Sequence, residues 1–354
     1  MQDPRIEALA RTLVHHSVAL KSGDRVLIVG PEESRPLALA VYRESVHAGA
    51  LPVLWATFEE SARILLDLGS EEQIGWSNPI LIEAVRQVDA YISLRAPANL
   101  RLLAGVDPAR SVVAQKARRH FLDVALQKRW VVCELPTAAL AQEAGMSTEE
   151  FETFSFAAVS ADWPAMRGEL DRLKAILERG SQVRIQAPGT DLTLGVSGRT
   201  WIADSGAHNM PGGEIFTGPR ENEVRGHITF GYPAVLNGRI AEGVRLTFVD
   251  GRVTDASAER GEEFLIAMLD TDPGARIVGE LGIGMNYGIT RHTRSTLFDE
   301  KIGGTIHVAL GRSYPETGGA NDSALHWDMV CDLRQDGSID LDGVRIQRAG
   351  QFTV

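Results

Sequence analysis

Residues 305–328 read TIHVALGRSYPETGGANDSALHWD. At the start of this stretch, Ile306, Val308 and Leu310 alternate with other residues, and a period of two is typical of a β-strand with one buried face. His307 would then project from the opposite face of that strand. The Gly-rich segment that follows predicts a turn, after which the chain returns as a second strand.

The second strand of this pair would carry His326 and Asp328, which are separated by a single residue. The strand period places both on one face and Trp327 on the other. A metal ion could bind both side chains. The alternative is that the histidine is a core residue satisfied by a carbonyl group and that the His-x-Asp spacing arises by chance. The stretch alone leaves both interpretations open.

The chain before residue 159 alternates between apolar strands and helices. The run RVLIVG at 25–30 is typical of a buried parallel strand. Strands and helices then follow in turn, and this order predicts a parallel α/β sheet with right-handed crossovers. The segments are strands at 51–56, 90–94 and 130–135 and helices at 36–47, 59–68, 78–88 and 108–127. We expect residues 1–158 to form a scaffold or dimerisation domain. The sequence has no G-x-G-x-x-G turn after the first strand and no phosphate-binding P-loop, so a nucleotide site is not predicted.

Residues 159–354 have a different composition, with more glycine and many short β segments. An amphipathic helix at 160–180 leads into two candidate strands, and residues 245–256 predict a hairpin with a turn at Asp250 and Gly251. The predicted fold class is therefore α/β, with an N-terminal parallel sheet domain and a C-terminal α+β domain that carries the metal site.

Composition restricts the function. The chain has 354 residues, a formal net charge of -11 and two cysteines, Cys133 and Cys331, far apart. The charge argues against a nucleic-acid partner, and the cysteine spacing argues against a thiolate zinc site. Without a visible signal sequence or a long apolar run, we expect a cytoplasmic protein that does not enter a membrane.

Two carboxylates complete a candidate site. Glu280 is the only charged residue between Arg276 and Arg291, and burying a lone carboxylate is costly unless it is paired or binds a cation. Glu214 follows Pro-Gly-Gly, so it is either a solvent-facing turn residue or a ligand. The full set has no thiolate, suits zinc, cobalt or manganese, and is too large for one tetrahedral ion. Its members are Glu214, Glu280, His307, Tyr314, His326 and Asp328. Two ions that share a carboxylate would occupy all six and would suit hydrolysis.

At these residues the chain resembles a known family. The segments GTDLTLGVSGRTW, HNMPGGEIFTGP, LFDEKIGGTIHVALGRSYPETGG and NDSALHWDM, with the segment around Glu280, resemble the metallo-aminopeptidases of the aminopeptidase T, S and II type. The resemblance implies a homodimer and two divalent ions per chain, zinc first, with cobalt or manganese as alternatives. It implies that all six residues stand at positions of metal ligands. It also implies that a metal-activated water removes N-terminal, leucine-like residues from short peptides.

Within this resemblance, Glu214 and Glu280 are the candidates for the general base, and Tyr314 would bind a metal or polarise the oxyanion. The chain departs from the family in being shorter before Glu214 and in carrying Lys301 where asparagine is expected. Two rival functions are a mononuclear iron dioxygenase that cleaves dihydroxypyridine rings and a binding protein without catalysis. Retention of both Glu214 and Glu280 argues against the dioxygenase, and the presence of every expected ligand argues against the binding protein.

Overall fold

The computed structural model describes residues 3–236 and 238–354, which separate into two compact units. The first contains the described residues up to Ser160 together with Gly206–Pro211, and the second contains Ala161–Ser205 and Gly212–Val354. Within the described ranges, none of the helices combines the length and the apolar character needed to span a bilayer.

The first unit is built on a parallel sheet with the strand order β2-β1-β3-β4-β8. Its strands are β1 (Arg25–Pro31), β2 (Leu51–Thr57), β3 (Ala90–Arg95), β4 (Arg129–Glu134) and β8 (Asn209–Met210). Its helices are α1 (Pro4–Arg11), η1 (Thr12–Ser17), η2 (Glu32–Ser34), α2 (Arg35–His47), α3 (Glu60–Leu68), α4 (Glu71–Ile74), α5 (Pro79–Arg86), α6 (Pro108–Ala125), α7 (Ala138–Glu143) and α8 (Thr148–Val159).

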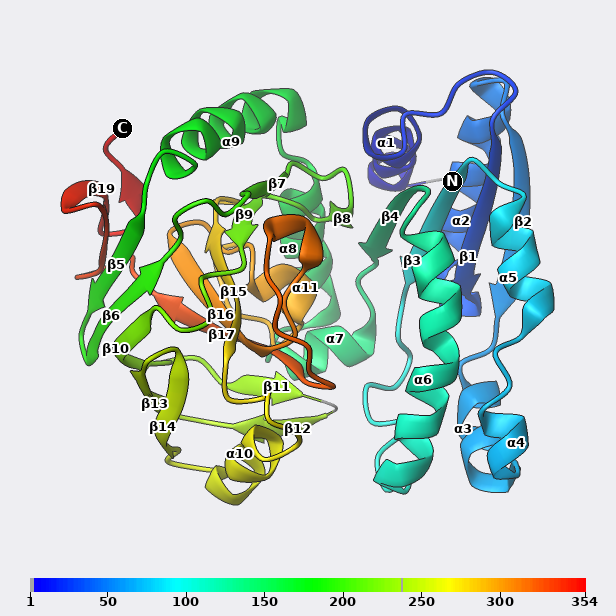
Figure 1. The fold of residues 1–354 in the computed structure, drawn as a ribbon. Coiled ribbons are helices and arrows are strands. Elements are labelled where there is room, and N and C mark those ends of the chain that lie inside the picture. The colour runs from blue at the N-terminus through cyan, green and yellow to red at the C-terminus, as the bar shows by residue number, and fades with distance from the viewer. Residues whose placement is uncertain (1–2, 237) are drawn as a thin grey trace. The chain divides into compact units, whose positions relative to one another are not determined.

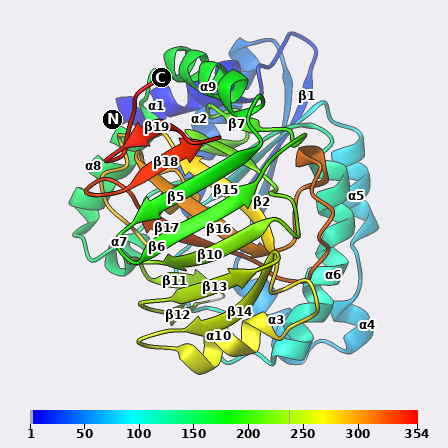
Figure 2. The same cartoon turned by 60° about the vertical axis from the view of Figure 1, so that its left-hand side comes forward.

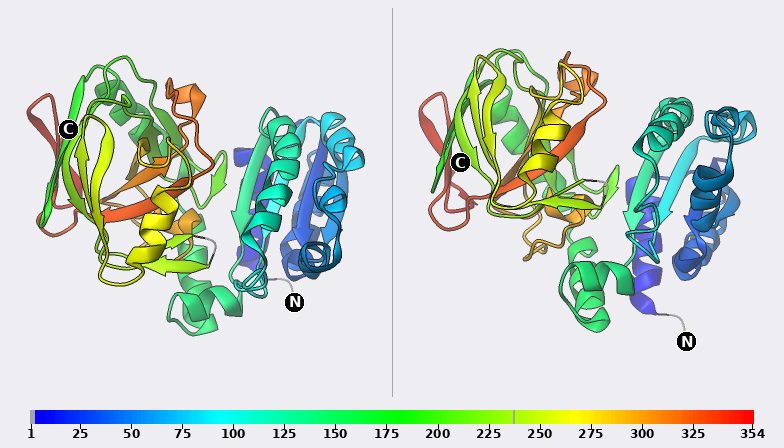
Figure 3. Two further views of the ribbon diagram at one scale, coloured as in Figure 1. Left: turned by 60° about the horizontal axis from the view of Figure 1, so that its bottom comes forward. Right: turned by 90° about the horizontal axis from the view of Figure 1, so that it is seen from below.

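Right-handed crossovers explain where these helices lie. The chain steps from β1 to β2 in one direction and from β3 to β4 in the other, so α2 and α6 cover opposite faces of the sheet. Leu27 and Tyr91 pack with Phe121 in the core under α6, and Figure 1 and Figure 3 show α6 lying along the strands of this sheet. The parallel α/β domain expected from the sequence is therefore confirmed.

The second unit contains two antiparallel sheets and a short hairpin. The larger sheet has the order β14-β13-β10-β6-β5-β18-β19-β20, and Figure 2 shows its strands side by side. Its members are β5 (Gln182–Ala187), β6 (Thr190–Gly195), β10 (Val224–Thr229), β13 (Arg245–Val249), β14 (Arg252–Ser257), β18 (Ser338–Leu341), β19 (Val344–Arg348) and β20 (Gln351–Phe352).

The smaller sheet has the order β17-β16-β15-β9-β7. Its members are β7 (Ile202–Asp204), β9 (Glu214–Thr217), β15 (Val278–Gly284), β16 (Thr305–Gly311) and β17 (His326–Asp332). The hairpin is formed by β11 (Ala234–Leu236) and β12 (Arg239–Ala241), and the helical segments are α9 (Trp163–Leu177), α10 (Glu262–Leu269), α11 (Thr296–Asp299) and η3 (Pro315–Thr317). This mixture agrees with the α+β domain expected from the sequence.

The core of the second unit lies between the two sheets. Ile185 and Leu192 of the larger sheet and Leu281, Ile306 and Val308 of the smaller sheet belong to one buried apolar cluster. Because strand side chains alternate, the residues between these apolar positions on β15 and β16 project from the other face of the smaller sheet. Polar side chains on that face are therefore held by a fully packed layer behind them.

Candidate metal centre

The smaller sheet brings the candidate ligands to one face through its register. Glu214 begins β9 opposite Gly284, and His307 on β16 lies opposite Gly282 on β15. On β17, Asp328 pairs with Ala309 and His326 with Gly311, whereas Trp327 between them is buried in the core. The neighbours on the ligand face are mostly glycine or alanine, so the longer side chains have room to converge.

A β-bulge determines which face Glu280 occupies. Val278 pairs with Leu310 but Glu280 pairs with Ala309, so Gly279 is an extra residue in β15. If the two strands paired regularly beyond Val278, Gly279 would pair with Ala309, and Glu280 would pair with Val308 and point into the apolar core. A side chain at residue 279 would lie 2.4 Å from the carbonyl oxygen of Arg312, so glycine is required there. The bulge therefore turns this carboxylate toward His307.

The two histidines are oriented by backbone carbonyl groups. Nδ1 of His307 donates to the carbonyl oxygen of Glu300 at 3.0 Å, and Nδ1 of His326 donates to that of Arg312 at 2.9 Å. This is the arrangement usual for metal-binding histidines, in which one ring nitrogen is fixed by a carbonyl and the other faces the ion. In both residues Nε2 is the nitrogen that faces the carboxylates.

Glu280 lies between the two imidazoles. Its Oε1 is 3.1 Å from Nε2 of His307, and its Oε2 is 3.6 Å from Nε2 of His326. Asp328 Oδ2 lies 3.5 Å from His326 Nε2, and Glu214 Oε2 lies 3.7 Å from His307 Nε2. The Glu280 carboxylate thus faces one histidine with each of its two oxygens.

Several buried oxygens fit a cation. Glu214 Oε2 and Asp328 Oδ1 are buried and accept no hydrogen bond from the described residues. Such atoms carry a desolvation cost that a bound ion would remove. The ligand atoms form two groups whose members lie within 4.8 Å of one another, and His307 belongs to both. These groups are Glu214, Glu300 and His307, and Glu280, His307 and Asp328. The residues present therefore fit divalent ions.

The remaining predicted residue, Tyr314, precedes η3 and lies at the margin of the site. Its ring packs edge-on against His326 with centroids 5.4 Å apart, and 43% of the residue is exposed. Although the residue as a whole is partly exposed, partial desolvation of its hydroxyl group beside the site and the negative charges of Glu280 and Asp328 raise the pKa of Tyr314 well above its usual value. Five predicted residues thus share one sheet face, and Tyr314 is brought to its edge from a loop.

The carboxylates hold protons on the imidazoles when no ion is bound. Burial lowers the pKa of both histidines, but Glu280 outweighs it and raises the pKa of His307 to about 9, and Asp328 likewise raises the pKa of His326 to about 10. Burial raises the pKa of Glu214 to about 8 despite the nearby Lys301. A metal ion would therefore displace protons from these side chains.

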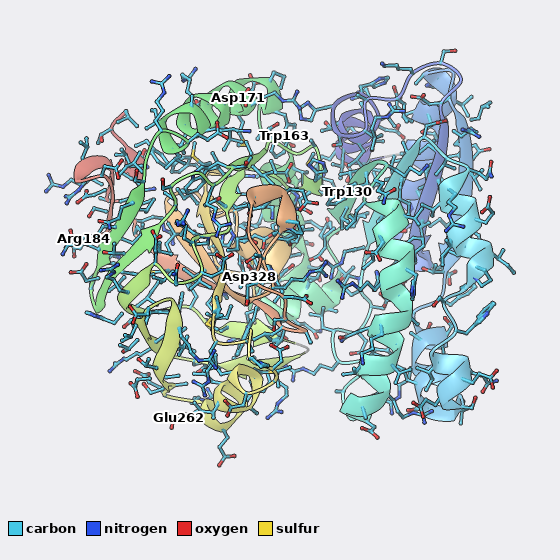
Figure 4. All side chains as sticks on the ribbon, viewed as in Figure 1. Trp130, Trp163, Asp171, Arg184, Glu262 and Asp328 are labelled. Carbon is cyan, nitrogen blue, oxygen red and sulfur yellow. The ribbon has the colours of Figure 1, made fainter. Side chains whose placement is uncertain are left out.

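Two further residues line the site, and the sequence indicated only Lys301, as a departure from the family pattern. Glu300 contributes a carboxylate to one ligand group and a carbonyl oxygen to His307. Lys301 is fully buried, and its ammonium group pairs with Glu214 and Glu300. The pattern of Asp299, Glu300 and Lys301 looks like a solvated charged turn, so local sequence gave no signal for Glu300. Figure 4 shows Asp328 inside this unit, whereas Arg184 and Glu262 point outward.

Comparisons with known proteins agree over almost the whole chain. The model of the family described as thermophilic metalloprotease (M29) matches residues 2–352. Aminopeptidase 2 of Geobacillus stearothermophilus is 30% identical over 408 aligned positions, which cover 99% of this chain and 98% of the relative. Aminopeptidase T of Thermus thermophilus is 29% identical, and its alignment also covers 99% of this chain and 98% of the relative. The structure of wild-type AmpT from Thermus thermophilus superposes with a TM-score of 0.87 at 27% identity and covers 99% of both chains.

The matches confirm the resemblance that was drawn from the sequence motifs. The chain therefore belongs to the thermophilic metalloprotease (M29) family, which implies the use of divalent metal ions.

Proposed function

We propose that the site uses two divalent ions to remove N-terminal residues from short peptides. The family match and the aminopeptidase relatives support a metal-dependent aminopeptidase, and they do not support the ring-cleaving dioxygenase. The observation that carries the proposal is the position of Glu280, whose two oxygens face Nε2 of two carbonyl-oriented histidines. One carboxylate shared in this way suits a pair of ions better than a single one.

The six predicted residues divide between two ion positions in this proposal. By the distances between their ligand atoms, Glu280, His326 and Asp328 would hold one ion, and Glu214 and His307, with Glu280 shared, would hold the other. Tyr314 stands beside His326 and would contact either an ion or the substrate carbonyl. When bound, such ions polarise a carbonyl and lower the pKa of water. Zinc is favoured over cobalt and manganese by its general affinity for imidazole and carboxylate ligands.

Residues around these ion positions would accept and donate the protons that are transferred in the reaction. Glu300 is a carboxylate beside Glu214 and His307, and both burial and Asp328 raise its pKa. A carboxylate with a raised pKa is suited to accept a proton from water and return it to the leaving amine. Glu300 therefore joins Glu214 and Glu280 as a candidate for the general base, with the advantage that the other two are assigned to ion binding.

We infer that a second copy of the chain pairs along β2. This strand forms one edge of the parallel sheet, and its apolar residues are exposed: Leu51 by 58%, Val53 by 52% and Leu54 by 39%. An open apolar edge is a template for another strand, and a second copy related by a two-fold axis presents the same edge. This supports the homodimer expected from the family resemblance.

The activity is tested with a pair of matched peptides. The metal-loaded protein should release leucine from Leu-Gly-Gly but should leave the N-acetylated peptide intact, because an aminopeptidase needs the free amine. Free amino acid is measured by mass spectrometry. Cleavage of the acetylated peptide at the same rate would contradict the aminopeptidase proposal. Oxygen uptake with bound iron, without peptide cleavage, would support the dioxygenase instead.

A further inference from the structure

Lys301 places a resident positive charge inside the candidate metal centre. The residue follows α11 and is completely buried. Its Nζ lies 3.2 Å from Oε1 of Glu214 and also contacts Oε1 of Glu300. A buried ammonium group needs such partners, and these two carboxylates belong to the group that would hold one of the ions. The lysine therefore uses one oxygen of each carboxylate.

The other oxygen of Glu214 remains free. Glu214 Oε2 is buried, accepts no hydrogen bond from the described residues and faces Nε2 of His307 at 3.7 Å. An ion at this oxygen would share the Glu214 carboxylate with the ammonium group of Lys301. Two positive charges on one buried carboxylate repel each other more strongly than they would in water.

The other half of the site has different neighbours. The ion pairs described for Glu280 and Asp328 within 4.0 Å are with His307 and His326. Both histidines are themselves candidate ligands, so neither is an additional cation beside an ion. Lys301 is not a candidate ligand, and its ammonium group pairs with Glu214 and Glu300. The ion position at Glu214 therefore has a neighbouring ammonium group that is absent from the described ion pairs of Glu280 and Asp328.

We propose that Lys301 is a positioning residue that holds Oε1 of Glu214 and Oε1 of Glu300. Its charge would lower the affinity for an ion at Glu214 below the affinity for an ion at Glu280, His326 and Asp328. The inference rests on the two-ion function proposed above. The weaker ion would exchange readily, whereas the stronger ion would remain with the protein.

The test measures ion stoichiometry and affinity, without reference to activity. The chelator-treated protein is titrated with Zn²⁺ by calorimetry, and retained zinc is counted by mass spectrometry after dialysis. The variants are Lys301→Met and Lys301→Gln, which remove the charge, and Lys301→Arg, which keeps it. Lys174→Met changes a partly exposed lysine on α9 that pairs with Glu178, and it serves as a matched control. Thermal unfolding confirms that each variant is folded, and Lys301→Gln, whose amide can still donate to both carboxylates, serves if Lys301→Met does not fold.

The wild-type protein should bind one tight and one weak ion, with dissociation constants at least about tenfold apart. Loss of the charge should lower the dissociation constant of the weaker ion by about tenfold or more. Lys301→Arg and Lys174→Met should keep the wild-type difference between the two dissociation constants. Two ions of equal affinity in the wild type, or a weaker second ion in Lys301→Met, would overturn the role of Lys301 and leave the two-ion function intact. A single ion in both the wild type and the neutral variants would overturn both proposals.

Discussion

The imidazoles of His307 and His326 make the candidate metal centre sensitive to pH. Their pKa values are about 9 and about 10 in the metal-free protein, above the value near 6.5 of an unfolded histidine. Protonation therefore stabilises the metal-free fold fully below about pH 6.5, and this stabilisation is lost as the pH rises through 9 and 10. Glu214, with a pKa of about 8, changes stability in the same direction.

We expect the free energy of unfolding of the metal-free protein to fall between pH 6.5 and 9, by at most about 1.4 kcal/mol per pH unit for each retained proton, and its melting temperature to fall with it. Added zinc should raise the melting temperature more at pH 8 than at pH 6, because fewer protons compete. Scanning calorimetry with and without zinc measures both effects. His307→Ala should weaken the pH dependence, and His227→Ala, an exposed residue on β10, should not. A zinc effect that is equal at both pH values would show that protons do not compete with zinc at this site.

Removal of the carboxylate of Glu280 or of Asp328 should weaken metal binding without unfolding the protein. Glu280→Ala and Asp328→Ala are each expected to lower kcat/KM by about 100-fold or more and to reduce the zinc retained after dialysis. Glu263→Gln on the exposed surface of α10 should change neither quantity. Circular dichroism checks folding. Full activity in either site variant would remove that residue from the metal centre.

At the scale of the strands, glycines on the ligand face keep space for the imidazoles. A Cβ atom at Gly282 would lie 2.0 Å from Cε1 of His307, whose side chain is buried and cannot move aside freely. We expect Gly282→Ala to displace this imidazole, to weaken zinc binding by about 10–100-fold and to cost about 1–3 kcal/mol of stability. Gly231→Ala is the control, because its Cβ would meet no atom within 4 Å. Unchanged zinc affinity in Gly282→Ala would show that His307 is not held as described.

The sequence predicts the elements with a clear period and misses those that depend on distant pairing. The strand at 305–310 and the strand carrying His326 are recognisable because apolar residues alternate, and β16 and β17 pair as expected. β15 was not predicted as a strand, because its glycines interrupt the pattern and its bulge at Gly279 is visible only in the pairing with β16. The helices α7 and α8 were also missed, since this part of the chain was not interpreted.

In the candidate site, too, residues with a local sequence pattern were predicted, and residues whose role depends on distant contacts were missed. His326 and Asp328 were recognisable as a pair from a local spacing, and the structure brings them to one face with Glu280 and His307. Glu300 was missed because its role comes from burial beside Lys301 and from the carbonyl group it offers to His307, and neither property has a local signal. The assignment of these residues as metal ligands stays a prediction.

At the scale of the whole molecule, pairing of two copies along β2 is expected to depend on the exposed apolar edge. Val53→Lys should shift the protein from dimer to monomer in light scattering coupled to gel filtration, because charged residues discourage strand pairing. Val112→Lys on α6 introduces the same change at a residue with similar exposure, 47% against 52%, and should leave the dimer intact. A dimer that survives Val53→Lys would place the interface elsewhere.

The proposed peptidase works with two ions per chain. Its most direct test is to strip the protein of metal and to follow hydrolysis of leucyl p-nitroanilide while zinc, cobalt or manganese is added in counted equivalents. Activity should rise to a plateau near two equivalents per chain for at least one of these metals. A plateau at one equivalent would contradict the pair of ions, and no hydrolysis with any of the three metals would contradict the aminopeptidase itself.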